Sequence, residues 1–267
     1  MKKGQLLSVI IPAYREAKTI RRDIKRIEEI LKQLRYAYEI IVVADGRYGT
    51  EDKTFEEAKK VESDKVHVHG YSKNMGKGYA VRYGMSRSKG EIVAFIDSGM
   101  EISPNSLSMA LEHLEWYGAD IIVGSKYHPA SKVSLSRMRR ITSAGYRLLI
   151  WLLFHLNLRD TQVGMKIFKR RVLEDVLPRL LVKRYAFDVE MLSVAYSLGY
   201  RRIFEAPIVM TPALSPLTSD TTIKAIFRML WDTMAVFYRL KIRRYYSNRN
   251  RENWKCDPDL NFKVGTS

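Results

Sequence analysis

The stretch Glu91-Ile-Val-Ala-Phe-Ile-Asp97 places five consecutive apolar residues directly before a carboxylate. A short apolar run of this kind predicts a buried strand, and an acid that ends such a strand would face a ligand rather than a core. Runs of the same type occupy residues 6–12, 39–44, 65–69 and 119–124, and they alternate with helical patterns near residues 17–34, 51–62, 76–88 and 104–117. This alternation predicts an α/β fold with a mostly parallel central sheet flanked by helices.

The second half of the chain has a different pattern. It predicts a basic helix at 136–158, a strand at 165–168, a helix at 186–198, a strand at 202–210 and a last helix at 221–241. No Pro/Gly/Ser-rich linker interrupts residues 1–242, so we expect one domain there. Residues 243–267 are polar and basic, and we expect them to form a loosely ordered tail.

The 267-residue chain is strongly basic. Its 46 Lys and Arg exceed its 29 Asp and Glu by 17, which favours a polyanionic partner such as nucleic acid, an anionic membrane or a phosphorylated substrate. No motif that reads nucleic acid supports the first of these. The single cysteine, Cys256, excludes an intrachain disulfide and fits a reducing, cytoplasmic setting. The longest apolar run, 148–154, is far shorter than the roughly 20 residues that cross a bilayer, so we expect no transmembrane segment.

The ends of the predicted strands mark where a ligand should bind, because ligands of open α/β sheets lie beyond the carboxyl ends of the strands. Asp97 is one such residue, but Gly99 stands where an Asp-x-Asp metal motif would have its second acid. Glu101 could share a divalent ion with Asp97 through oxygen ligands, which suits Mg²⁺ or Mn²⁺. Alternatively, Glu101 and Ser103 only cap the helix that begins near Pro104.

Three further groups of residues could carry chemistry. The turn Asn74-Met-Gly-Lys-Gly78 precedes a predicted helix whose free N–H groups could hold a phosphate, with Lys77 adding charge; it could equally be a tight connection. Asp160 could be a catalytic group or a turn former. Asp188 and Glu190 open a helix, where acids also stabilise the helix dipole.

Two helices have the composition of membrane-surface helices. Apolar residues recur at steps of three and four from Ile223 to Phe237, and the basic and aromatic segment 239–246 follows. The helix around 137–158 combines several arginines with Trp151 and Phe154. Such stripes usually pack on their own domain, but the basic and aromatic flanks suit a headgroup layer, so we expect amphipathic interface helices.

Taken together, the strand ends resemble family-2 glycosyltransferases of the GT-A (Rossmann-like) fold. Four ordered motifs carry this resemblance: Val9-Ile-Ile-Pro-Ala-Tyr-Arg-Glu16, Glu39-Ile-Ile-Val-Val-Ala-Asp-Gly46, Asn74-Met-Gly-Lys-Gly-Tyr-Ala-Val-Arg82 and Gly90-Glu-Ile-Val-Ala-Phe-Ile-Asp97. In the second half, Gly124-Ser-Lys126, Arg139-Arg140 with Ser143, the stretch 159–170 and the stretch 185–190 are similar to the branch that holds dolichyl-phosphate glucosyltransferases and dolichyl-phosphate mannose synthases. Of these two groups, the dolichyl-phosphate glucosyltransferases are the more similar to this sequence.

The resemblance implies a role for each motif. It implies a nucleotide-sugar-binding half at 1–118 and an acceptor half at 119–242. The donor would contact Pro12, Ala13, Tyr14, Glu16, Asp45, Lys77, Asp97 and Ser98. The acceptor phosphate would contact Lys126, Arg139, Arg140 and Ser143, while Asp97 with Glu101 would hold the metal and Asp97, Asp160 and Gln162 would serve catalysis.

The implied reaction is inverting transfer of a hexose, glucose or mannose, from a UDP- or GDP-sugar to a polyprenyl or dolichyl phosphate. It would take place at the cytoplasmic face of a membrane, with the protein peripherally attached. Since a lipid phosphate is already ionised near neutral pH, Asp160 could orient the acceptor rather than deprotonate it. The alternatives are a family-2 enzyme that acts on a glycan or a soluble acceptor, with Asp160 as a true base, and a non-catalytic protein that binds nucleotide sugars.

Overall fold

The first half of the chain forms four parallel strands with helices between them. The computed structural model describes residues 4–46, 52–133, 137–184, 186–211, 223–260 and 262–264. The strands are β1 (Leu6–Ala13), β2 (Ala37–Asp45), β3 (Val66–Tyr71) and β4 (Ile92–Ile96), and the helices are α1 (Ile20–Leu31), α2 (Thr54–Lys59), α3 (Lys77–Arg87) and α4 (Asn105–Trp116). The predicted alternation of strands and helices is therefore confirmed.

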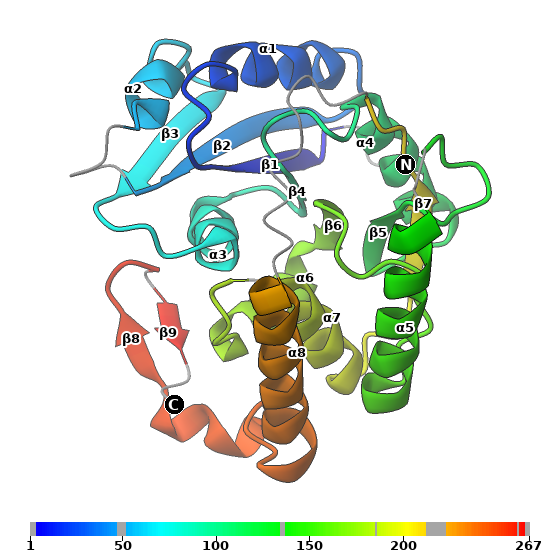
Figure 1. Cartoon of the computed structure of the whole chain (residues 1–267). Coiled ribbons are helices and arrows are strands. Elements are labelled where there is room, and N and C mark those ends of the chain that lie inside the picture. The colour runs from blue at the N-terminus through cyan, green and yellow to red at the C-terminus, as the bar shows by residue number, and fades with distance from the viewer. Residues whose placement is uncertain are drawn as a thin grey trace.

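The second half completes the sheet. Its strands are β5 (Ile121–Ser125), β6 (Met165–Lys169) and β7 (Ile203–Pro207), and its helices are α5 (Arg137–Phe154), α6 (Arg170–Val176), η1 (Leu177–Arg179), α7 (Phe187–Ser197) and α8 (Ile223–Phe237). The seven-stranded sheet has the order β3-β2-β1-β4-β6-β5-β7 (Figure 1). Only β6 runs antiparallel to its neighbours within this sheet, so the expected mostly parallel sheet is confirmed.

Both faces of the sheet are buried, as in other α/β folds. Successive residues of a strand point to opposite faces. Val9 thus faces the core under α1, α2 and α4, whereas Ile10 faces the core under α3, α6 and α7. The register keeps this division across strands, because Ile10 pairs with Ile41 on one side and Phe95 on the other, and all three lie in the second core. Continuous apolar runs were therefore the correct strand signal here.

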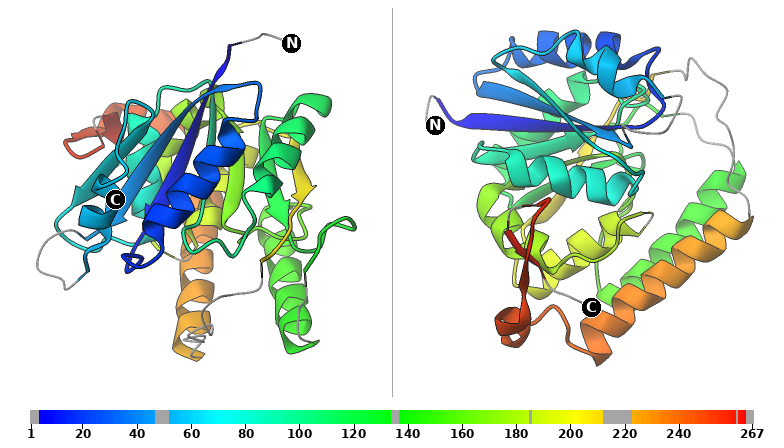
Figure 2. Two further views of the ribbon diagram at one scale, coloured as in Figure 1. Left: turned by 90° about the horizontal axis from the view of Figure 1, so that it is seen from above. Right: turned by 90° about the vertical axis from the view of Figure 1, so that its left-hand side faces the viewer.

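Helices α5 and α8 stand side by side and project from the body of the protein (Figure 2). The Tyr146 and Thr233 hydroxyl oxygens lie 2.9 Å apart, and the rings of Phe154 and Phe237 pack with centroids 6.3 Å apart. We call these two helices the α5–α8 arm. A short π-helix, η2 (Tyr238–Ile242), directly follows α8 in the chain. Among the described helices, none combines the length and the apolar content that crossing a membrane requires.

The C-terminal segment packs on the body of the protein. It forms η3 (Asn248–Asn253) and a hairpin of β8 (Lys255–Asp257) and β9 (Phe262–Val264). Tyr246 is 2% exposed, and its hydroxyl donates to Glu190 Oε1 across 2.6 Å. Arg179 Nε donates to the Tyr246 carbonyl oxygen, and Leu260 is also buried. The expectation of a loosely ordered tail is wrong for these residues, because its aromatic and apolar side chains reach a buried carboxylate and the core.

Candidate active site

The carboxyl ends of the parallel strands meet around one cleft of about 560 Å³. Its lining includes most of the residues that the sequence assigned to the donor, the metal and catalysis: Pro12, Ala13, Tyr14, Asp45, Lys77, Asp97, Ser98, Glu101 and Gln162. It also includes Asn74, Gly76, Ala80, Arg184, Asp188 and Met229. The structure therefore brings together side chains that lie up to 217 positions apart in the chain, from Pro12 to Met229.

Asp45 organises the turn that leads into α3. Its Oδ1 accepts hydrogen bonds from Met75 N at 2.7 Å and from the Tyr71 hydroxyl at 2.9 Å, and its Oδ2 accepts one from Gly76 N at 2.9 Å. Asp45 is 4% exposed. Because these donors engage both carboxylate oxygens, Asp45 shapes the cleft wall through the turn as well as by its own contact with the cleft.

The two glycines of this turn are required by close packing. Gly76 has φ +96°, a conformation that favours glycine, and a side chain there would meet Lys183 O at 2.7 Å. A side chain on Gly78 would lie 2.6 Å from Phe187 at the start of α7. The beginnings of α3 and α7 thus meet at the cleft, and both helices direct their positive dipole ends toward it. One turn can therefore serve both as a tight connection and as a binding site for phosphate, the two alternatives that the sequence offered.

Lys77 and Asp97 form an ion pair within the cleft. Lys77 Nζ lies 2.7 Å from Asp97 Oδ2, and the two side chains are 35% and 38% exposed. Burial lowers the pKa of Lys77, but the carboxylates of Asp97 and Asp188 outweigh burial and the net shift is upward. Lys77 is therefore a cation at neutral pH. Asp97 Oδ1 is buried and has no hydrogen-bond partner among the residues that the structure describes, so one oxygen remains for a ligand.

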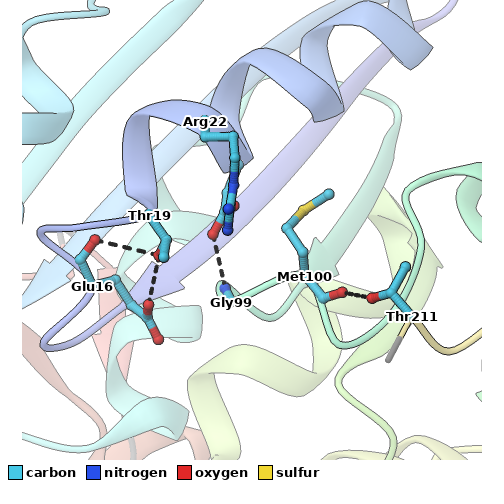
Figure 3. Close-up of polar contacts among 7 residues, drawn as sticks. Glu16, Thr19, Arg22, Gly99, Met100 and Thr211 are labelled. Atoms are coloured by element: carbon cyan, nitrogen blue, oxygen red, sulfur yellow. Dashed lines mark hydrogen bonds and ion pairs between the residues drawn. The ribbon is translucent and has the colours of Figure 1, made fainter. Parts of the chain in front are cut away.

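A sharp turn follows Asp97. Gly99 has φ +85°, and its N–H donates to Asp23 Oδ2 across 3.1 Å. The next residue is tied to a distant segment, because the Met100 carbonyl oxygen accepts a hydrogen bond from the Thr211 hydroxyl (Figure 3). The position where the metal motif would have its second acid is thus occupied by a glycine, in a backbone conformation that residues with a side chain rarely adopt. The sequence showed the absence of the acid but not this reason for it.

Glu16 lies beside the cleft rather than in its lining. Its Oε2 accepts a hydrogen bond from the Thr19 hydroxyl at 2.8 Å (Figure 3). Burial raises the pKa of Glu16, and the nearby carboxylates of Asp23, Asp52 and Glu101 raise it further. The resemblance placed Glu16 in contact with the donor; the structure gives this side chain a role in the turn before α1.

Glu101 shares the cleft with Asp97 and does not cap α4. This helix begins at Asn105 without a side-chain hydrogen bond at its cap, so the capping alternative for Glu101 and Ser103 is not supported. Within the described parts of the chain, no three His, Cys, Asp or Glu side chains cluster closely enough to hold a metal ion by themselves. The protein therefore offers one free carboxylate oxygen on Asp97, with Glu101 nearby.

A second pocket, of about 270 Å³, lies beside the N-terminal half of α5. Lys126, Arg140 and Ser143, three of the four residues expected at the acceptor phosphate, line it. The rest of its lining is Tyr127, Val133, Ala144, Arg147 and Arg159. The side chain of Arg139, the fourth expected residue, lies outside the described part of the structure. Four basic residues in one small pocket make it suited to a phosphate.

Asp160 connects this basic pocket to the cleft. Its Oδ2 accepts a hydrogen bond from Lys126 N at 3.2 Å, and its Oδ1 accepts one from Gln162 N at 3.2 Å. Gln162 in turn donates from Nε2 to Met229 Sδ. Asp160 is 8% exposed and lines neither pocket, so the geometry favours the turn-forming interpretation and an orienting role over that of a base.

Several lining residues carried no usable signal in the sequence. Met229 comes from a region far from the recognised motifs, whereas Arg184 directly precedes the stretch 185–190, and both reach the cleft through tertiary packing. Asp188 stood out as an acid at a helix start, but an acid there is ordinary. Arg147 and Arg159 were visible as basic residues without an assigned position. Sequence periodicity indicates which face of a helix is apolar, but it does not indicate which element packs against that face.

Comparison with known proteins places the chain in a family. The sequence profile of glycosyl transferase family 2 matches residues 8–177, and the chain belongs to this family. Its fold is the GT-A fold, since the structure is similar to mannosyl-3-phosphoglycerate synthase from Rubrobacter xylanophilus, with a TM-score of 0.68, 18% identity and coverage of 91% of this chain and 76% of that one. It is also similar to glucosyl-3-phosphoglycerate synthase from Mycobacterium tuberculosis in complex with Mn²⁺, UDP and phosphoglyceric acid, with a TM-score of 0.64, 20% identity and coverage of 88% and 78%.

The chain is also similar in sequence to two curated proteins. The chain is 36% identical over 208 residues to the dolichyl-phosphate beta-glucosyltransferase of Drosophila melanogaster, covering 72% of this chain and 63% of the relative. It is 33% identical over 215 residues to the human protein of the same name, covering 76% and 64%. The chain thus spans less than two thirds of the length of these relatives.

Proposed function

We propose that this protein transfers glucose from a nucleotide sugar to a polyprenyl or dolichyl phosphate at a membrane surface. The observation that carries the proposal is the arrangement of two adjoining sites. A cleft with the Lys77–Asp97 pair suits a sugar diphosphate, and a pocket with Lys126 and Arg140 suits a second phosphate. The relatives named above as dolichyl-phosphate beta-glucosyltransferases support this choice of donor sugar and acceptor.

The donor would lie along the sheet edge. Pro12, Ala13 and Tyr14 would contact the base and ribose, with the Asp45-held turn beside them. Lys77 would face the diphosphate. We propose UDP as the nucleotide, as in the UDP complex of the structurally similar glucosyl-3-phosphoglycerate synthase.

A divalent cation, Mg²⁺ or Mn²⁺, would bind at Asp97. The unpartnered, buried Oδ1 of Asp97 fits such an ion, and Glu101 lies in the same cleft. Hard divalent cations take carboxylate and phosphate oxygens, so the donor would complete a site that the protein only begins. When bound, the cation would supply stabilisation of negative charge on the leaving diphosphate.

The reaction would be a single in-line displacement with inversion. An acceptor phosphate oxygen attacks the anomeric carbon, the bond from that carbon to the diphosphate oxygen breaks, and the nucleoside diphosphate leaves with the electron pair. Lys77 stabilises the leaving group, while Lys126 and Arg140 orient the attacking phosphate. Asp160 holds the backbone of Lys126 and Gln162 in place and abstracts no proton, because the acceptor is already ionised.

The acceptor would be reached from a membrane. Exposed apolar residues recur along one stripe of α8 and η2 at three- and four-residue steps: Phe227, Trp231, Met234 and Tyr238, which are 69%, 70%, 45% and 48% exposed. Leu148, Trp151 and Leu152 of the neighbouring α5 are about half exposed as well. Exposed basic residues, Lys241, Arg243 and Arg244, follow the stripe. Such an arm fits an anionic bilayer surface, and we propose peripheral attachment at the cytoplasmic face.

A transfer assay tests this proposal. The purified chain would be incubated with radiolabelled UDP-glucose or GDP-mannose, Mg²⁺ or Mn²⁺, and anionic vesicles that contain a polyprenyl phosphate. We expect lipid-extractable label with UDP-glucose only when both the cation and the polyprenyl phosphate are present. No lipid product with either donor would contradict the proposal. Transfer to 3-phosphoglycerate in the absence of vesicles would instead favour a soluble phosphorylated acceptor.

A further inference from the structure

Lys166 is a buried cation that the proposed mechanism does not use. It lies in β6 and is 0% exposed, and its Nζ donates to Asp188 Oδ1 and to Val163 O, each across 2.7 Å. Burial lowers its pKa, and the carboxylate of Asp188 opposes this shift. Because an unpaired buried charge is costly, Lys166 and Asp188 hold each other in fixed positions. Of the two, only Asp188 lines the cleft.

The order of the strands places Asp188 along the cleft. Asp45 ends β2, Pro12 lies in β1, Asp97 follows β4, and the next strand in the sheet is β6, which carries Lys166. Beyond β6 lies β5, which leads into Lys126 of the basic pocket. Asp188 is thus held by the strand that lies between β4, which leads to Asp97, and β5, which leads to Lys126. In an in-line transfer the hexose occupies the space between the diphosphate and the acceptor phosphate.

We propose that Asp188, held in place by Lys166, accepts hydrogen bonds from hydroxyl groups of the transferred hexose and helps to select the donor sugar. The inference rests on the proposed function and adds a specificity residue to it. A carboxylate suits this task, since it is an acceptor only and sugar hydroxyls are donors. Lys166 engages Oδ1, so Oδ2 is the oxygen that can serve the sugar. Lys166 itself is a positioning residue that acts through Asp188.

Asp188 could instead serve Lys77, whose charge it also stabilises. The two roles differ in what they do to the affinity for the nucleotide alone. Loss of a sugar contact weakens binding of UDP-glucose and leaves binding of UDP unchanged. Loss of a Lys77 anchor weakens both, because Lys77 faces the diphosphate that the two ligands share.

The decisive variant is Asp188→Asn, which keeps the size of the side chain and an oxygen for Lys166. Dissociation constants for UDP and UDP-glucose would be measured by calorimetry with Mg²⁺ present, with thermal unfolding as the check on folding. We expect affinity for UDP-glucose to fall about tenfold, the loss typical of a hydrogen bond to a charged group, and affinity for UDP to stay within about twofold. An equal loss for both ligands, or no loss for either, would overturn the inference. Asp64→Asn, at an exposed carboxylate between α2 and β3, is the matched control.

Two further measurements separate positioning from a structural role. Lys166→Met should reproduce the selective loss for UDP-glucose, and the double variant Lys166→Met/Asp188→Asn should lose no more selectivity than Asp188→Asn alone. The ratio of kcat/KM for UDP-glucose to that for UDP-galactose, which differs in one hydroxyl orientation, should fall in Asp188→Asn. A wild-type chain that neither binds UDP-glucose nor transfers glucose would remove the proposed function together with this inference. A wild-type chain that transfers glucose, with an unchanged sugar ratio in Asp188→Asn, would remove the inference alone.

Discussion

Asp97 lies directly against Gly164: its backbone N–H donates to the Gly164 carbonyl oxygen across 2.8 Å, and its carboxylate fills the space that a side chain on Gly164 would need. The end of β4 and the approach to β6 are therefore fitted to each other at the cleft. A Cβ atom on Gly164 would lie 1.8 Å from Asp97 Oδ2, so Asp97 or the backbone must move if Gly164 is replaced.

Gly164→Ala should consequently reduce transfer by about tenfold or more, because a displaced Asp97 loses its position toward the donor. The cost in folding free energy should be about 1–3 kcal/mol, as for other overpacked sites. Initial rates and urea unfolding measure the two effects. Gly145→Ala, where an added Cβ meets nothing within 4 Å, is the control of equal size. Equal rates for the two variants would show that the position of Asp97 does not limit the reaction.

Asp97→Asn should lower kcat/KM by about 100-fold or more, since it removes the charge that the cation and Lys77 share, which is worth several kcal/mol. The residual rate should respond less to Mg²⁺ than the wild-type rate does. Titration of Mg²⁺ into EDTA-treated enzyme measures both effects. Asp64→Asn serves again as the exposed control. An unchanged metal dependence in Asp97→Asn would place the cation elsewhere.

The positions of the strand ends could be predicted because they depend on local pattern. Continuous apolar runs, each closed by a polar residue, identified Asp45 and Asp97 before any spatial information was available. The placement of β6 could not be predicted, because its pairing joins Phe95 to Lys166, 71 positions away. Lys166 lies between the apolar residues Met165 and Ile167 of β6, and only the packed structure shows that Asp188 neutralises it.

The prediction for the C-terminal segment was wrong for a related reason. Composition classed it as a polar tail, yet Tyr246 ties it to a buried carboxylate 56 residues earlier. The amphipathic pattern of α8, in contrast, was readable from the sequence. What the sequence left open was whether the stripe packs on the domain, and the structure leaves Phe227 and Trp231 mostly exposed.

Arg140→Gln should raise the KM for the polyprenyl phosphate by about tenfold or more and change the KM for the nucleotide sugar little, because a charge-assisted hydrogen bond to the phosphate is worth about 1.5–3 kcal/mol. Saturation curves for each substrate at a fixed concentration of the other separate the two constants. Arg26→Gln, at an exposed position of α1, controls for the change in net charge. A rise in both constants would indicate that the second pocket does not serve the acceptor alone.

Trp231→Ser should weaken binding to anionic vesicles by about tenfold, since burial of a large apolar side chain is worth about 1.5–3 kcal/mol. Vesicle flotation at several protein concentrations gives the partition coefficient. Trp116→Ser is the matched control, because Trp116 on α4 is also 70% exposed but lies outside the α5–α8 arm. If both variants bind as the wild type does, the arm is not the membrane contact.

Tyr246→Phe should destabilise the fold by about 1–3 kcal/mol, because it removes a hydrogen bond to the buried Glu190 carboxylate. The neighbouring Tyr245 provides an internal control. Its hydroxyl is also buried, but it has no hydrogen-bond partner in the described ranges, so Tyr245→Phe should be neutral or slightly stabilising. Urea unfolding of the two variants measures the difference directly. Wild-type stability in both variants would mean that ring packing, which phenylalanine preserves, holds the C-terminal segment, whereas a loss confined to Tyr246→Phe would assign that role to the bond with Glu190.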